Sequence, residues 1–202
     1  MSVLNRNIVY FVTPGSLNTF SVIAAVKERL KFGDIKQVVV PFTTGTTAQK
    51  FSQELENDVE IIPVAEDEAL SACKRIVYPD QGLLGRLVRA RLEEVSETTE
   101  KKLRREAFDI TFLPFCGETW NAVRETLYAF GQGMKVAIEI SVAAVEIEKV
   151  KPYTKIIATG GTGEGVDTAI VTRTSPQNDA FSKKSKKRLS IQEIIAMPIE
   201  KW

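Results

Sequence analysis

Short apolar runs punctuate the first third of the chain. Residues 8–12, 38–40 and 59–64 are almost entirely apolar, and each run has the length of one buried strand. Pro63 in the third run indicates a strand end or an edge strand, because proline cannot donate to a ladder of backbone hydrogen bonds. These runs predict the first three strands of a sheet.

Amphipathic stretches separate the three predicted strands. Apolar residues recur on one face over residues 18–31, with Asn18 as a candidate N-cap, and again over residues 46–56. Strands that alternate with helices predict a three-layer, doubly wound, mostly parallel α/β sheet. We expect residues 1–202 to form one such domain, because no linker or internal repeat divides them.

The rest of the chain continues this pattern less regularly. Apolar residues at helical spacing run through the highly charged residues 84–107, which predicts one long charged helix in the middle of the chain. Another amphipathic helix is expected over residues 120–130, ended by Gly131 or Gly133. Further strands are predicted at residues 109–113, 136–142, 156–159, 168–174 and 193–197.

Composition excludes several classes of function. The 27 basic and 26 acidic residues nearly cancel, which argues against a nucleic-acid-binding surface. The chain has no histidine, so Ser-His-Asp catalysis, Cys-His catalysis and histidine metal sites are excluded. Cys73 and Cys116 lack the number and spacing of a zinc site. Without a signal peptide or a membrane-length apolar run, the chain is expected to be cytoplasmic and to make no membrane contact.

The most informative segment lies between the second predicted strand and the helix after it. Thr43, Thr44, Thr46 and Thr47 surround Gly45 there. The N–H groups and positive dipole end of a helix N-terminus favour an anion, glycine allows close approach, and threonine hydroxyls add neutral donors. This threonine loop predicts a site for a phosphorylated small molecule. A threonine-rich helix cap is the alternative.

A second candidate is the glycine-rich segment of residues 160–165, which contains Gly160, Gly161, Thr162 and Gly163. A Rossmann fingerprint must lead into a helix and a Walker A loop needs a lysine, and this segment meets neither condition. A glycine turn between two strands would instead present backbone N–H groups as an anion nest. A flexible turn is the alternative.

A third candidate follows the first predicted strand. Ligands of doubly wound sheets bind beyond the carboxyl ends of the strands, at the point where the strand order reverses. Asn18 and Thr19 are therefore expected near the threonine loop, although capping alone would also explain Asn18.

Charged and thiol side chains complete the candidates. Glu139 and Asp167 stand near presumed strand ends, and Arg173 has the charge to pair with a phosphate. Cys116 precedes a predicted helix start that would favour a thiolate, but a lone cysteine is more often packing. The five cations of residues 183–188 are expected to form a solvated loop, with contact to an anionic ligand or a neighbouring subunit as the alternative.

The segment VVVPFTTGTTAQKF resembles the C-terminal domain of pyruvate kinase, in which a buried strand leads into a T-x-S-G-x-[ST]-A loop and then a helix. Gly45, Thr47 and Ala48 match this pattern, whereas Thr44 replaces its serine and Phe42 its leading threonine. In allosteric members of the kinase family this loop holds the phosphate of a sugar bisphosphate. The resemblance therefore implies a phosphate-binding role for the threonine loop.

The chain also resembles the stand-alone pyruvate kinase α/β domain-like proteins. The shared motifs are IVYFxxPGxxNT, VxxEI, GGxxxGxDTAxVxR and EIIxMP, which here occupy residues 8–19, 136–140, 160–173 and 193–198. This family is functionally uncharacterised, and the resemblance implies flavin mononucleotide (FMN) as a ligand. The catalytic barrel of the kinase, which needs some 200 residues, is absent, so phosphoryl transfer from phosphoenolpyruvate is not expected.

Three functions remain open at this point. The chain could bind a phosphorylated small molecule such as FMN, or act as a regulatory, homo-oligomeric module that binds a sugar-phosphate effector. It could also be a flavin- or phosphate-dependent enzyme in which Cys116, Glu139 or Asp167 supplies the chemistry.

Overall fold

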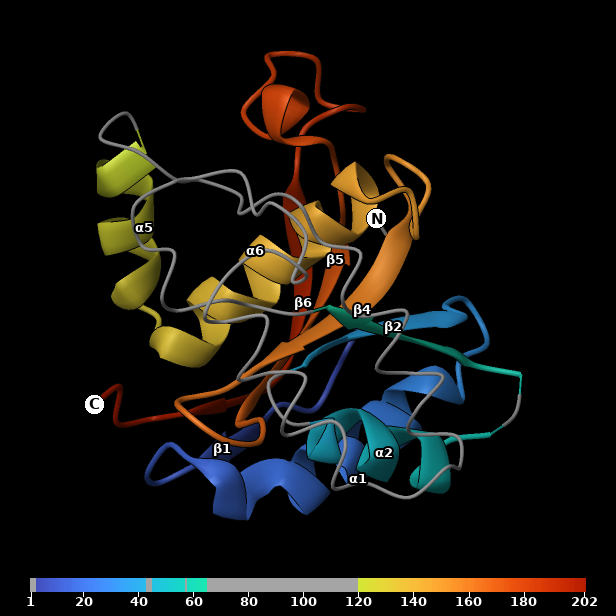
Figure 1. The fold of residues 1–202 in the computed structure, drawn as a ribbon, viewed down its shortest axis with the longest axis vertical. Coiled ribbons are helices and arrows are strands. Elements are labelled where there is room, and N and C mark those ends of the chain that lie inside the picture. Colours follow the sequence, from blue (N-terminus) through green and yellow to red (C-terminus); the bar gives the residue numbers. More distant parts are fainter. Residues whose placement is uncertain (1–2, 43–44, 57, 65–119) are drawn as a thin grey trace, which may run out of the picture.

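The computed structural model describes residues 3–42, 45–56, 58–64 and 120–202 (Figure 1). The charged helix predicted at residues 84–107, the strand predicted at residues 109–113, and both cysteines lie outside these described residues.

A mixed six-stranded sheet in the order β1-β6-β5-β4-β2-β3 forms the centre of the described fold. Its strands are β1 (Val9–Phe11), β2 (Gln37–Pro41), β3 (Glu60–Val64), β4 (Lys155–Gly160), β5 (Thr168–Arg173) and β6 (Ser190–Pro198). Strand β5 runs antiparallel to both of its neighbours, and the other pairs are parallel. The predicted α/β class is confirmed. Five of the six strands run in the same direction, as expected for a mostly parallel sheet, and the single antiparallel strand β5 makes the sheet mixed. The glycine turn joins β4 directly to β5, and a short turn can only return the chain antiparallel.

Helices cover both faces of the sheet (Figure 1). Helices α1 (Thr19–Leu30) and α2 (Thr46–Glu54) pack on one face, and α5 (Asn121–Tyr128) and α6 (Gln132–Glu146) lie on the other. Strand β2 shows the alternation that fills both interfaces, since Val38 and Val40 pack with α1 and α2 while Val39 packs with α6. Two short 3-10 helices, Ser16–Asn18 and Gln177–Asp179, complete the described elements. The predicted three layers are therefore present.

The strand predicted at residues 136–142 is wrong, because this segment is the middle of helix α6. Nearly every side chain of α6 is buried, so the helix has no polar stripe that would reveal its period in the sequence. A continuous apolar run can be either a buried strand or a buried helix, and here the length of 15 residues fits the helix.

The first predicted strand is present, but the expectation that it is buried is wrong. Strand β1 lies at one edge of the sheet, where Val9 and Tyr10 are exposed. Among the described strands the opposite edge is β3, which contains Pro63 one residue before its end, in agreement with the strand end or edge strand that this proline indicates.

The carboxyl ends of β1, β2, β3, β4 and β6 meet at one side of the sheet, together with the start of β5. This follows from the register, which places Phe11 beside Pro198, Pro41 beside Val64 and Gly160 beside Thr168. We call this side the carboxyl edge. Because α1 and α2 each follow a strand that ends here, both helices begin at the carboxyl edge.

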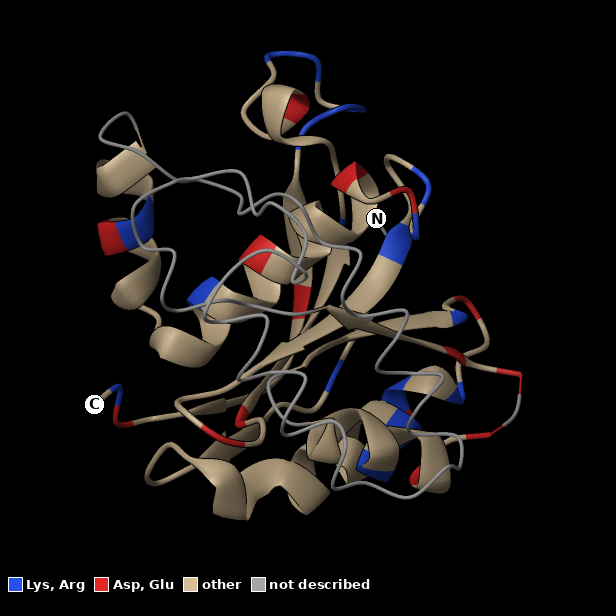
Figure 2. Cartoon of the chain, in the orientation of Figure 1, with Lys and Arg blue, Asp and Glu red and all other residues tan. Residues whose placement is uncertain are grey.

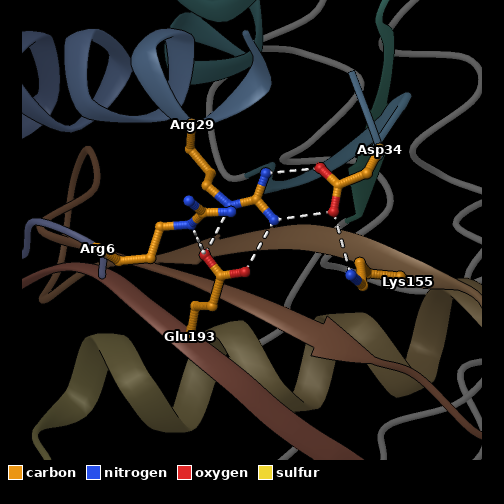
Figure 3. Close-up of polar contacts among 5 residues, drawn as sticks. All are labelled: Arg6, Arg29, Asp34, Lys155 and Glu193. Carbon is orange, nitrogen blue, oxygen red and sulfur yellow. Dashed lines mark hydrogen bonds and ion pairs between the residues drawn. The ribbon is translucent and has the colours of Figure 1, made fainter. Parts of the chain in front are cut away.

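The opposite side of the sheet is held by ion pairs (Figure 3). Arg29, at the end of α1, is 5% exposed and donates to both Asp34 and Glu193 at 2.6–3.1 Å. Lys155 also donates to Asp34, and Arg6 lies 3.4 Å from Glu193. The hydrogen bonds from Arg29 lower the pKa of both carboxyl groups and raise the pKa of Arg29. This network fixes the end of α1 to β6 and to the start of β4.

Candidate functional site

Helix α2 begins at the carboxyl edge with a glycine N-cap. Gly45 is buried and has a φ of 85°, a left-handed conformation that glycine adopts without the penalty of a Cβ. Its carbonyl accepts from Gln49, but as a glycine it offers no side chain to the N–H groups of the first turn. Thr46 is exposed and Thr47 half-buried, so both are near the surface at this helix start.

The two ends of the glycine turn between β4 and β5 are tightly packed, whereas its tip at Gly163 has open space around it. A Cβ on Gly160 would lie 2.0 Å from the carbonyl oxygen of Gly133, and one on Gly161 would lie 2.3 Å from that of Gly165. Gly163 and Gly165 have positive φ and reverse the chain. The glycines thus allow the turn to touch the start of α6 on one side and its own return on the other.

Asp167 ties three segments together at the carboxyl edge. Its side chain is fully buried, and its Oδ2 accepts from the backbone N–H groups of Gly15 (2.9 Å) and Thr162 (3.2 Å). Its Oδ1 accepts from the hydroxyl of Thr168 at 2.9 Å. A Cβ on Gly133 would lie 2.3 Å from Oδ1, so the carboxylate sits against the first turn of α6, where the helix dipole favours a negative charge.

The segment before α1 packs on the same turn. The hydroxyl of Thr19 donates to the carbonyl of Ser16 (2.7 Å) and accepts from the N–H of Val166 (3.1 Å), so it is used inside the protein. Asn18 occupies the N-cap position of α1, as predicted, but its side chain makes no capping bond and donates instead to the carbonyl of Thr13. The side-chain amide of Asn18 therefore bonds within its own loop and not to the start of α1.

The structure thus gathers most of the predicted residues at one edge and leaves two elsewhere. Asn18, Thr19, Gly45, Thr46, Thr47, Gly160, Gly161, Thr162, Gly163 and Asp167 all lie at the carboxyl edge. Thr43 and Thr44 lie outside the described residues.

Glu139 and Arg173 are the two residues placed elsewhere. Glu139 belongs to the middle of α6, where it is 2% exposed and pairs with Lys135 at 2.9 Å. Its expected position at a strand end depended on the incorrect strand at residues 136–142. Arg173 ends β5 on the opposite side of the sheet and donates to the carbonyls of Ser185 and Arg188. It holds the basic loop of residues 183–188, which gathers lysine and arginine away from the carboxyl edge (Figure 2).

Two features of the carboxyl edge are not predicted by the sequence patterns. One is the start of α6, because Gly131 and Gly133 indicate the end of a helix in the sequence, whereas in the structure Gly131 is the N-cap of α6. The other is Lys201, whose stem lies against Gly131 and whose Nζ donates to the carbonyl of Pro198. Burial lowers the pKa of Lys201, with the charge of Asp167 acting in the opposite direction. No local sequence pattern predicts this position of Lys201.

The three helix starts at this edge differ in what occupies them. The start of α6 faces the Asp167 carboxylate, and Thr19 at the start of α1 is bonded to Ser16 and Val166. Among the described residues, no carboxylate bonds to the start of α2.

No family model matches this chain. Within the part of the chain that the structure describes, no helix combines the length and the apolarity needed to cross a membrane.

Proposed function

We propose that this protein binds a phosphorylated small molecule at the carboxyl edge, with the phosphate at the start of α2. The observation that carries the proposal is that residues 45–47 of the threonine loop lie at the same edge of the sheet as the segment before α1 and the glycine turn, which bond to each other. This is the position at which open α/β sheets bind ligands.

The choice of α2 rests on charge and conformation. Asp167 occupies the start of α6, so a second anion there would meet like charge. At α2, the left-handed Gly45 lets the chain turn directly into the helix, and Thr46 and Thr47 bring hydroxyl donors to its first turn. Asp167 serves as a positioning residue in this proposal, because its oxygens already accept from Gly15, Thr162 and Thr168.

FMN is the ligand that we propose to test first, since the family resemblance implies it, and a sugar bisphosphate is the second. We propose binding and not catalysis, because neither candidate carboxylate is placed to react with a ligand at this edge. Asp167 already accepts from three donors, and Glu139 lies away from the carboxyl edge.

Titration of the purified protein with FMN, a sugar bisphosphate and inorganic phosphate tests this proposal. Thr47→Val keeps the shape of the side chain and removes its hydroxyl, so it should cost about 1–3 kcal/mol of binding if a buried phosphate contact is lost. Gly45→Asp should weaken binding further, because it adds a negative charge and strains a φ of 85°.

Thr126→Val on α5 is the matched control, since Thr126 is exposed and its hydroxyl only donates to the carbonyl of Ala122. This variant should bind as the wild type does. If Thr47→Val and Gly45→Asp also bind as the wild type while remaining folded, the threonine loop is only a helix start. If none of the three compounds binds the wild type, the proposed function is wrong.

A further inference from the structure

The two edge strands of the sheet differ in how they are protected. Strand β3 carries the charged, exposed Glu60 and the ring of Pro63, which are the features that keep a sheet edge from pairing with another chain. Strand β1 has neither, because residues 8–12 contain no charge and no proline. Apolar side chains are nevertheless exposed there, with Tyr10 at 55% and Val12 at 70%.

The backbone of β1 offers hydrogen-bonding groups on its open side. The carbonyl of Phe11 accepts from the N–H of Ile199, so Phe11 directs its backbone groups toward the β6 side. Successive residues of a strand direct these groups to opposite sides. The N–H and C=O groups of Tyr10 therefore face away from β6, toward the edge.

We propose that β1 pairs with β1 of a second copy of this chain, antiparallel about a twofold axis at Tyr10, so that the two sheets become continuous. In this register Tyr10 faces its own copy and directs its backbone N–H and C=O across the axis. Ile8 faces Val12, whose carbonyl accepts from the N–H of Glu200 on the β6 side, so this pair contributes side-chain contact. Val9 faces Phe11. Every cross-strand pair is apolar or aromatic, a combination that stabilises antiparallel strands. An interface that matches itself in this way closes as a dimer and does not propagate.

The exposed surface around β1 is large enough for such a dimer. The exposed fractions of Leu4, Ile8, Val9, Tyr10, Val12 and Ile199 correspond to roughly 600 Å² of mainly apolar surface. A standard stable interface takes about 800 Å² from each partner, of which a little over half is apolar. The apolar surface near β1 is therefore of the size of the apolar part of such an interface.

The first test is the mass in solution, measured by sedimentation equilibrium over a range of concentrations. The wild type is expected to be a dimer. Tyr10→Lys places two like charges directly opposite each other at the axis and should weaken dimerisation at least tenfold. Glu60→Lys, which changes the charge of the other edge strand, should leave the dimer intact.

Cross-linking locates the contact even if Tyr10→Lys disturbs folding. In a background with Cys73→Ser and Cys116→Ser, Tyr10→Cys should form a disulfide-linked dimer on oxidation, since facing residues in a bonded antiparallel pair have Cα atoms about 5.5 Å apart. Glu60→Cys is the control and should stay uncross-linked. A wild type that is monomeric at all concentrations overturns the proposal. So does a dimer that survives Tyr10→Lys and gives no Tyr10→Cys cross-link.

Discussion

Removing the carboxylate of Asp167 should destabilise the fold far more than removing a carboxylate from the surface of the same turn. Asp167→Ala deletes the acceptor of two backbone N–H groups, those of Gly15 and Thr162, and the partner of the Thr168 hydroxyl. Leaving a buried donor without a partner costs about 1–3 kcal/mol. Because Gly15 is half-buried and Thr162 is exposed, water can reach both N–H groups in part, and we expect a total loss of about 2 kcal/mol.

Asp167→Asn separates the charge from the hydrogen bonds. An asparagine oxygen in the place of Oδ2 can accept from both backbone N–H groups, and its amide can donate to Thr168 once that hydroxyl rotates. What remains is the loss of a negative charge at the start of α6, worth about 0.3–2 kcal/mol. Asparagine should therefore be clearly less harmful than alanine.

Urea denaturation measures these differences, and hydrogen exchange of the Gly15 and Thr162 amides shows whether both bonds are lost. Glu164→Ala is the matched control, because Glu164 is exposed in the same turn and its loss should cost less than about 0.5 kcal/mol. The reasoning is refuted if Asp167→Ala costs no more than Glu164→Ala, or if both amides stay protected without the carboxylate.

Two further predictions concern packing and pH. Gly160→Ala should lower the free energy of unfolding by about 2 kcal/mol or more in urea denaturation, because its Cβ would collide with a backbone oxygen at 2.0 Å. Gly163→Ala has open space around it and should cost only about 1 kcal/mol, for the strain of a φ of 80°. Equal costs would contradict the packed turn. Arg29 lowers the pKa of Glu193 and Asp34, so their contribution to stability is complete above their unfolded pKa values near 4 and is lost as the pH falls through the folded values. Arg29→Met should therefore cost about 2–3 kcal/mol at pH 7 in denaturation experiments. This cost should begin to fall once the pH drops below about 4 and should keep falling toward the lowest accessible pH, and a cost independent of pH would contradict this account.

Local patterns predicted most elements of this fold, and the errors have physical causes. Residues 38–40 follow a loop signal and precede an amphipathic helix, so both β2 and α2 could be located from the sequence. The buried helix α6 could not, because an element covered on nearly all sides carries no periodic polar positions. The antiparallel direction of β5 follows from the glycine turn, which joins two strands directly, whereas alternating strands and helices alone predict parallel neighbours.

The candidate site was predictable where it depends on local chain conformation. A glycine between threonines at a strand-to-helix junction indicated the start of α2, and the structure gives Gly45 the left-handed φ that requires glycine. Tertiary partners were not predictable. Asp167 is a candidate ligand contact in the sequence, but in the structure it lies buried against Gly15 and the start of α6. Lys201 lies against Gly131 because strand β6 ends at Pro198, three residues before it.

Amide chemical-shift mapping tests the central claim most directly. The 15N-labelled protein would be titrated with FMN and, separately, with inorganic phosphate. The proposed function predicts that the largest shifts fall on the first turn of α2, residues 45–48, and on residues 15–19 and 160–165, which lie at the same carboxyl edge. Inorganic phosphate should perturb mainly residues 45–48. Shifts that are absent with both compounds, or that gather around the basic loop of residues 183–188 on the opposite side of the sheet, would contradict a phosphate site at the start of α2.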